Sequence, residues 1–243
     1  DLRWAGRLSQ AVFGLDDHRR HYECLPPEHA HTGDILVTRY VTPLRLHGDS
    51  RTHSRDLSPR QLYLVTSGQA GVLTAGRHAR DVMQGEDGLT GAVVAHGYFI
   101  RRGHAPADSG CHADRTMPAL YRMTVSGGRL IAEEVARGIE QFQVQYGIDI
   151  DGDAMLDGFI DAMAAGDPRW QQLRAVRIWL LARTGCPETG YDNTRHYRMG
   201  NITLIPATTD LDGDGIIDGD SDGDGNDDYR RQLFTATVAL RNI

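Results

Sequence analysis

The chain has 243 residues, of which 40% are hydrophobic and 24% are charged, so it is long enough and apolar enough to bury a sizeable core. Its formal net charge of −7 arises mainly from one aspartate-rich segment near the C-terminus, and the rest of the chain is close to neutral. Arginine residues are scattered and form no basic stripe, which argues against a nucleic-acid-binding protein. No apolar run reaches the length of about 18 residues that a membrane-spanning helix needs.

The first segment of regular structure is predicted to be a helix. Within residues 1–15, apolar side chains recur at helical spacing, at Leu2, Ala5, Leu8, Ala11, Val12 and Leu15. We therefore expect residues 1–15 to form the end of an amphipathic helix. Because the pattern is already under way at Asp1, we expect an earlier part of this helix to precede it.

The remainder of the chain predicts strands that are separated by long polar loops. The predicted strand ranges are 35–40, 61–66, 71–74, 92–101, 119–125, 142–148, 175–182 and 233–240. Strict alternation around 142–148 predicts that Phe142, Val144, Tyr146 and Ile148 share one face, and that Gln141, Gln143 and Gln145 face water.

One helix followed by many strands predicts an α+β fold, in which an N-terminal helix packs on one or more antiparallel sheets connected by long loops. The predicted organisation is a helical end at residues 1–15 and a globular, β-rich domain over residues 16–243. Two aspartate-rich loops are predicted within that domain, at residues 149–157 and 210–228.

The segment 210–228 contains nine aspartates and five glycines, and the pattern D-x-D-x-D-G-x-x-D occurs in it twice in succession. Carboxylates so close together repel one another unless a hard cation lies among them. Glycine at the sixth place permits the sharp turn that brings the oxygens together, and the seventh residue offers a backbone carbonyl. The predicted calcium ligands are Asp210, Asp212, Asp214, Ile216, Asp218, Asp220, Asp222, Asp224, Asn226 and Asp228.

This doubled motif differs from an EF-hand, because neither copy has glutamate at the twelfth place and no amphipathic helices flank it. It is closer to the tandem aspartate-rich loops of extracellular repeat proteins, and a solvated acidic loop without bound metal is the alternative. A weaker third copy consists of Asp149, Asp151, Asp153 and Asp157, with Ala154 in the place of the turn glycine. We predict two calcium ions in 210–228, with 149–157 as a candidate for a third.

The cysteines, the histidines and a search for known catalytic motifs give no indication of enzymatic activity. Cys24, Cys111 and Cys186 lie far apart, so one disulfide is expected in any of three pairings, with three free thiols as the alternative. The 11 histidines lack the spacing of zinc ligands. The sequence also lacks nucleophile-elbow, metalloprotease, P-loop and dinucleotide-binding motifs, so we predict that the protein is not an enzyme.

Five segments resemble the PilW family of type IV pilus minor pilins. They are residues 1–7 (DLRWAGR), 119–122 (ALYR), 138–153 (GIEQFQVQYGIDIDGD), 175–183 (AVRIWLLAR) and 229–242 (YRRQLFTATVALRN). The patterns Q-V-Q-Y-G-x-D-x-D-G-D and V-x-L-R-N are the specific ones, and the order and spacing agree along most of the chain. The doubled aspartate-rich motif is richer than the family pattern, so the calcium prediction rests on its residues alone.

The resemblance implies a structural role in pilus assembly. Such a protein would sit in the inner membrane through its N-terminal helix, face the periplasm, and then enter the extracellular pilus, or fimbrium. Its implied partners are other minor pilins and the major pilin, in a complex that primes polymerisation and can cap the tip, where a host or surface ligand could bind. Twitching motility and cell adhesion would depend on such pili.

Two other functions fit the same sequence. A minor pseudopilin of a type II secretion system would have the same architecture and helix-first topology. A secreted calcium-dependent adhesin would account for the aspartate-rich loops without any pilus machinery.

Overall fold

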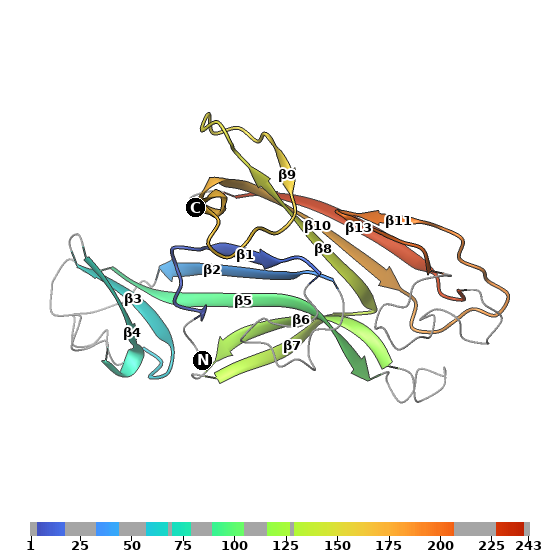
Figure 1. Ribbon diagram of the computed structural model, residues 1–243. Helices are drawn as coiled ribbons and strands as arrows, with labels where there is room; N and C mark the ends of the chain where they lie inside the picture. The colour runs from blue at the N-terminus through green and yellow to red at the C-terminus, as the bar shows by residue number, and fades with distance from the viewer. Residues whose placement is uncertain are drawn as a thin grey trace. The chain divides into compact units, whose positions relative to one another are not determined.

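The computed structural model describes residues 4–17, 33–43, 57–67, 70–78, 89–104, 116–126, 129–206 and 227–240. Within these ranges the protein is built from β-strands, with short 3-10 helices at η2 (Gly76–His78) and η3 (Pro168–Gln172). The strands labelled in Figure 1 are β1 (Val12–Leu15), β2 (Ile35–Pro43), β3 (Leu62–Ser67), β4 (Ala70–Ala75), β5 (Leu89–His104), β6 (Thr116–Ser126), β7 (Arg129–Arg137), β8 (Ile139–Ile148), β9 (Gly158–Ile160), β10 (Leu173–Arg183), β11 (Tyr197–Met199), β12 (Ile202–Leu204) and β13 (Arg231–Ala239).

The chain divides into two compact units. The first comprises residues 1–12, 37–97 and 122–133, and the second comprises residues 13–36, 98–121 and 134–243. Strands β1, β2, β5, β6 and β7 each begin in one unit and end in the other. Hydrogen-bonded pairing links β1, β2, β5, β3 and β4 in that order, with β6 bonded to β5 and β7 bonded to β6.

The first unit contains the β3–β4 hairpin. Its register places Leu62 opposite Ala75 and Ser67 opposite Ala70, and β3 also pairs antiparallel with β5. Alternate side chains of β3, Tyr63 and Val65, are buried, as expected for a strand with one face in a core. The predicted strands at 61–66 and 71–74 are therefore confirmed.

The prediction of a helix over residues 1–15 is wrong for the part that the structure describes. Residues 4–11 form turns, and residues 12–15 form strand β1. Two backbone carbonyls of this segment accept hydrogen bonds from the side chain of Arg39 and not from amides of a helix. Arg39 donates from Nε to Trp4 O at 2.5 Å and from Nη1 to Gln10 O at 2.7 Å. The Arg39 amide likewise donates to Ala11 O at 2.7 Å, so this segment is bonded as the neighbour of β2.

The fold class is therefore all-β rather than α+β, and no α-helix occurs among the described residues. Apolar residues three and four apart suggested a helix, but Gly6 and Gly14 weaken a helix by about 1 kcal/mol each. Long-range hydrogen bonds of the kind that Arg39 makes then favour turns and a strand over a helix, because local helix propensity is weaker than tertiary interactions.

The second unit contains a four-stranded antiparallel sheet in the order β13–β10–β8–β9. On one face of this sheet, Phe142, Val144, Tyr146 and Ile148 are all buried, as the alternation predicted. The Trp170 ring lies on this side, with its centroid 4.9 Å from that of Tyr146 and 5.3 Å from that of Phe13. Its indole Nε1 donates to Ala164 O at 2.9 Å, which satisfies the buried polar atom.

The prediction that the glutamines of β8 face water is wrong, because the opposite face of the sheet is covered as well. Leu181 of β10 packs there with Tyr197, Met199 and Leu204 of the β11–β12 hairpin. Gln141 and Gln143 are only 4% and 1% exposed. Side-chain hydrogen bonds satisfy the glutamines, for example from Gln145 Nε2 to Asp161 Oδ1 at 2.9 Å. Alternation shows which residues share a face, but it does not show what covers that face.

Candidate functional site

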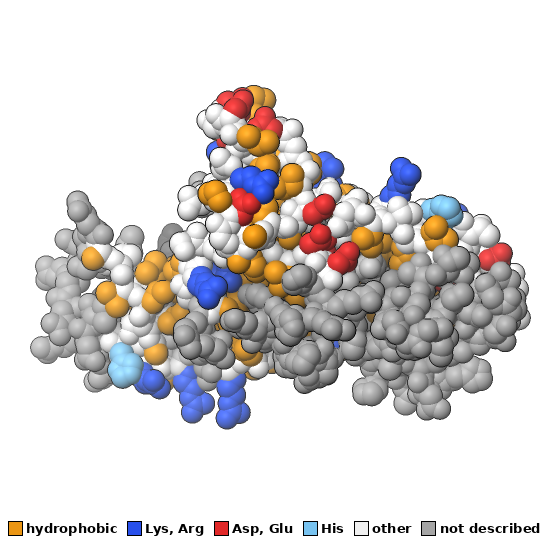
Figure 2. Space-filling view, viewed as in Figure 1, with side chains coloured by type: hydrophobic (Ala, Val, Ile, Leu, Met, Phe, Trp, Pro, Cys, Tyr) orange, Lys and Arg blue, Asp and Glu red, His pale blue; other side chains and the backbone are white. Residues whose placement is uncertain are grey.

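The described aspartate-rich loop, residues 149–157, connects β8 with β9 in the second unit. Its ends are held together, because the Asp149 amide donates to Gln172 O at 3.0 Å and the Asp157 amide donates to Ile148 O at 2.9 Å. Figure 2 shows acidic and hydrophobic side chains side by side at this turn. Ile150 and Met155 are 64% and 68% exposed, so the loop presents apolar side chains beside its carboxylates.

The backbone of the loop folds around one buried carboxylate. Asp149 Oδ1 accepts from the Gly152 amide at 2.7 Å, and Asp149 Oδ2 accepts from the Ala154 amide at 3.0 Å. Gly152 has a φ of 82° and Ala154 has a φ of 68°. Ala154 thus adopts the left-handed conformation for which the sixth place of a calcium loop ordinarily uses glycine, at a cost of about 1 kcal/mol.

Three of the four predicted ligands in this loop come together. One carboxylate oxygen from each of Asp149, Asp151 and Asp153 lies within 4.8 Å of the others. Asp157 does not join this group, and its Oδ2 accepts from the Ile150 amide at 2.6 Å. The arrangement offers oxygen ligands of the kind that a hard cation takes.

The protein also supplies a counter-charge of its own to this group. Arg174 Nη2 donates to Asp149 Oδ2 at 2.8 Å. Burial by itself raises the pKa of Asp149, but hydrogen bonds from the Gly152 amide, from Arg174 and from the Ala154 amide together lower that pKa below its ordinary value. Asp149 is therefore held as a carboxylate and organises the turn, whereas Asp151 and Asp153 are exposed.

Most of the doubled motif lies outside the residues that the structure describes. This applies to Asp210, Asp212, Asp214, Ile216, Asp218, Asp220, Asp222, Asp224 and Asn226. Asp228 is described and buried, and its backbone carbonyl accepts from the Glu188 amide at 2.9 Å.

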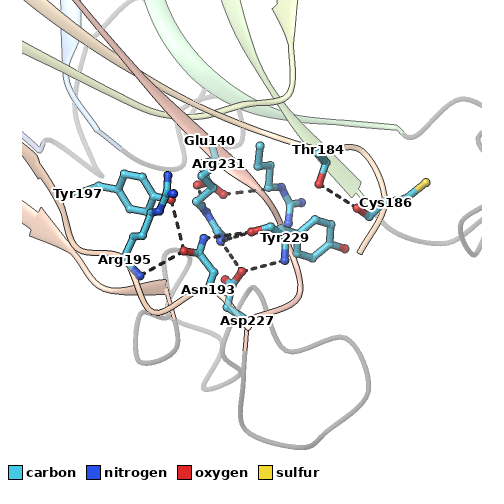
Figure 3. A network of polar contacts seen from close by, with 10 residues as sticks. Glu140, Thr184, Cys186, Asn193, Arg195, Tyr197, Asp227, Tyr229 and Arg231 are labelled. Carbon is cyan, nitrogen blue, oxygen red and sulfur yellow. Dashed lines mark hydrogen bonds and ion pairs between the residues drawn. The ribbon is translucent and has the colours of Figure 1, made fainter. Parts of the chain in front are cut away.

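A buried ionic network lies at the C-terminal end of the doubled motif, and sequence reasoning did not identify it (Figure 3). The side chain of Arg231, at the start of β13, bonds to the carboxylates of Glu140 and Asp227, and all three are almost completely buried. Asp227 Oδ1 also accepts from the Tyr229 amide at 2.9 Å. Asn193 completes the network by donating from Nδ2 to Tyr229 O at 3.0 Å.

This network anchors the end of the aspartate-rich segment to the four-stranded sheet. Burial raises the pKa of Glu140, and the adjacent positive charges of Arg231 and Arg183 oppose that increase. The available signal was the pair of adjacent arginines, Arg230 and Arg231, just before the predicted strand at 233–240. Alternation requires one of two neighbours to point inward, and an inward arginine needs acidic partners.

Two further observations concern the cysteines and the helices of the described residues. Cys186 is disulfide-bonded, and Cys24 and Cys111 both lie outside the described residues. Among the residues that are described, no helix has the length and apolar character needed to cross a membrane.

Comparison with known proteins identifies the family. A family model described as type IV pilus-assembly protein W matches residues 97–242. This range contains β6 to β13, both faces of the four-stranded sheet, the loop at 149–157 and the network around Arg231. No solved structure and no curated protein matches the chain. Since the match covers more than half of the sequence, the chain belongs to the PilW family and is involved in type IV pilus assembly.

Proposed function

We propose that the protein is a minor pilin that takes part in priming type IV pilus assembly and is placed at the pilus tip. The observation that carries this proposal is the family match over residues 97–242. Its partners would be the other minor pilins and the major pilin, and it would move from the inner membrane and periplasm to the extracellular pilus. The role that we propose is structural, in keeping with the family's part in pilus assembly.

Priming can be separated from elongation by counting filaments. Deletion of the gene is expected to lower the number of pili per cell severalfold while leaving the length distribution of the remaining pili unchanged, because a primer acts once for each filament. Electron microscopy of deleted and complemented cells measures both quantities. Normal pilus numbers in the deletion strain would contradict the priming role, and gold labelling along the whole shaft would contradict a tip position.

We further propose that the aspartate-rich loops bind structural calcium. In the loop 149–157, support comes from the three carboxylates within 4.8 Å of one another and from the left-handed backbone at Ala154. In 210–228, support comes from the doubled D-x-D-x-D-G-x-x-D register. Extracellular calcium modules commonly have a Kd of about 10⁻⁴–10⁻³ M, which suits occupancy outside the cell.

Calcium that binds only the folded protein should raise its melting temperature. A tenfold excess over Kd stabilises by about 1.4 kcal/mol for each independent site. Asp212→Asn combined with Asp222→Asn is expected to abolish most of this rise, and Asp151→Asn combined with Asp153→Asn to remove a smaller part. Thermal unfolding with calcium and with a chelator measures the effect. An undiminished calcium response in the variant with all four changes would reject the calcium assignment.

A further inference from the structure

The outer edge of strand β13, in the second unit, is open. The four-stranded sheet has the order β13–β10–β8–β9, and among the described residues β13 pairs with β10 alone (Figure 1). Every residue from Phe234 to Ala239 is exposed. A strand in this position presents a row of backbone amides and carbonyls to which another strand can bond.

The hydrogen bonds between β10 and β13 show which backbone groups face outward. The Leu240 amide donates to Arg174 O at 2.8 Å, and the Thr184 amide donates to Arg230 O at 2.9 Å. The register between the two strands is continuous, so the even-numbered residues of β13 bond to β10 throughout. In an antiparallel ladder the alternate residues then direct their amides and carbonyls to the other side. The exposed part of the edge thus offers the backbone groups of Leu233, Thr235, Thr237 and Ala239.

The sequence of this edge lacks the features that ordinarily prevent edge strands from pairing. Residues 232–240 (QLFTATVAL) include no charged residue, no proline and no glycine. By contrast, strand β7, which pairs with β6 alone among the described strands, carries Arg129, Glu133, Glu134 and Arg137. Strand β9, at the opposite edge of the sheet that contains β13, has only three residues. Since natural edge strands are commonly short or charged, a long uncharged edge favours pairing with another strand.

One face of β13 continues an apolar face of the sheet. Phe234 and Val238 of β13 lie opposite Leu180 and Val176 of β10. The residues of β8 on the same face are buried, whereas Phe234 and Val238 are 55% and 49% exposed. An added strand with apolar side chains at alternate positions would cover these two side chains and remove apolar surface from water.

Strand β13 is complementary to itself. When two copies pair antiparallel about a two-fold axis at Ala236, Phe234 of each copy lies opposite Val238 of the other. Thr235 lies opposite Thr237 in the same way. Aromatic–β-branched pairs and Thr–Thr pairs are favourable across antiparallel strands. Ala236 meets its own copy in a pair without hydrogen bonds, where side chains approach most closely, and alanine is small enough for that place. The segment brings no like charges together, because it has none.

We propose that β13 is an interaction surface for a second copy of this chain, which binds by antiparallel pairing of the two β13 strands. The two sheets then join into one sheet with four strands from each copy. Pairing of the same edge on both copies is closed, so it ends at a dimer. One pair of edge strands is a small interface, and interfaces below about 1,200 Å² are commonly weak. The dimer should therefore depend on protein concentration, with the monomer prevailing in dilute solution. This inference depends neither on calcium nor on the proposed role in priming.

The first test introduces charge at the two-fold axis. Ala236 is exposed, so Ala236→Lys should leave the fold of the single chain unchanged, but in the dimer it places two like charges opposite each other. Sedimentation equilibrium of the purified chain at up to about 1 mM measures the dimer dissociation constant. Ala236→Lys and Ala236→Glu should each weaken dimerisation severalfold, and an equal mixture of the two variants should restore it, because opposite charges then meet.

Three outcomes of this test would overturn the proposal. The first is a wild-type chain that stays monomeric at every concentration. The second is a dimer that Ala236→Lys leaves undiminished, because its contact would then lie elsewhere on the chain. The third is a mixture of the two charged variants that dimerises no better than either variant alone, because the two copies of residue 236 would then not face each other.

A disulfide tests the register directly. The Cα atoms of an antiparallel pair without hydrogen bonds are about 4.5 Å apart, within the range that a disulfide spans. Ala236→Cys should therefore form a covalent dimer on mild oxidation, and mass spectrometry of the digested dimer identifies the bond. Ala239→Cys is the matched control, because in this register residue 239 lies opposite residue 233, which separates the two introduced thiols by about 20 Å. Cross-linking of Ala236→Cys no greater than that of Ala239→Cys would overturn the pairing.

Discussion

Replacing Arg231 with methionine is expected to destabilise the protein by about 3–5 kcal/mol. Arg231 is the buried cation between Glu140 and Asp227, and methionine keeps most of its volume while removing the cation that bonds to both carboxylates. Glu140 then retains only the more distant Arg183, whose Nε lies 3.7 Å from Glu140 Oε2. Urea unfolding of the purified protein measures the change in free energy. Because the network anchors the end of the aspartate-rich segment, cells that carry this variant should also contain less folded protein and fewer pili.

The neighbouring residue provides a matched control. Arg230 pairs with Glu188 on the surface, and both side chains are more than half exposed, so Arg230→Met should have little measurable effect. Adding Glu140→Gln and Asp227→Asn to Arg231→Met should recover part of the lost stability. Similar effects of the Arg230 and Arg231 substitutions would contradict the view that the buried network anchors the segment.

The loss caused by Arg231→Met should depend on pH with a definite sign. Burial raises the pKa of Glu140, and removal of Arg231 raises it further, so the folded state binds more protons than the unfolded state above the unfolded pKa. Stability of the variant should therefore increase as the pH falls from about 7 towards about 5, and more steeply than that of the wild type over the same range. A pH-independent difference between the two proteins would argue against an uncompensated carboxylate.

Trp170→Ala should have the second large effect, a destabilisation of about 3–5 kcal/mol. Trp170 is buried against Phe13 and Tyr146, and its indole donates to Ala164 O, so alanine leaves a cavity and one carbonyl without its donor. Chemical denaturation of the variant measures the loss. Trp170→Phe should cost less, because it refills most of the volume.

Phe234→Ala serves as the control for an aromatic truncation in the same unit. Phe234 lies on β13 and is 55% exposed, so its removal should cost less than about 1 kcal/mol. If the two truncations destabilised the protein equally, the packing around Trp170 would not be the principal core contact of this unit.

Several features of this protein could be derived from the sequence because they depend on local pattern. The strands at 142–148 and 233–240 were predicted from alternation and those at 61–66 and 175–182 from short apolar runs, and the structure contains them. The resemblance to PilW was visible in short segments and is confirmed by the family match. The grouping of Asp149, Asp151 and Asp153 also followed from spacing, because residues so close in the chain can meet within one turn.

Other features depended on tertiary contacts. Residues 12–15 carry a helical apolar pattern, yet they form a strand because β2 offers hydrogen bonds that a short isolated helix cannot match. Gln143 looks like a surface residue in the sequence, but it is buried because the second face of β8 is also covered.

The tertiary structure also decided which charged residues meet. Asp34 bonds to Val144 across 110 positions, and Arg231 bonds to Glu140 across 91. Sequence periodicity reports which residues share a face of one element, whereas burial and charge compensation depend on what the rest of the chain places against that face. By itself, the sequence therefore determined several of the strands and the family, and the fold alone determined the buried ionic network.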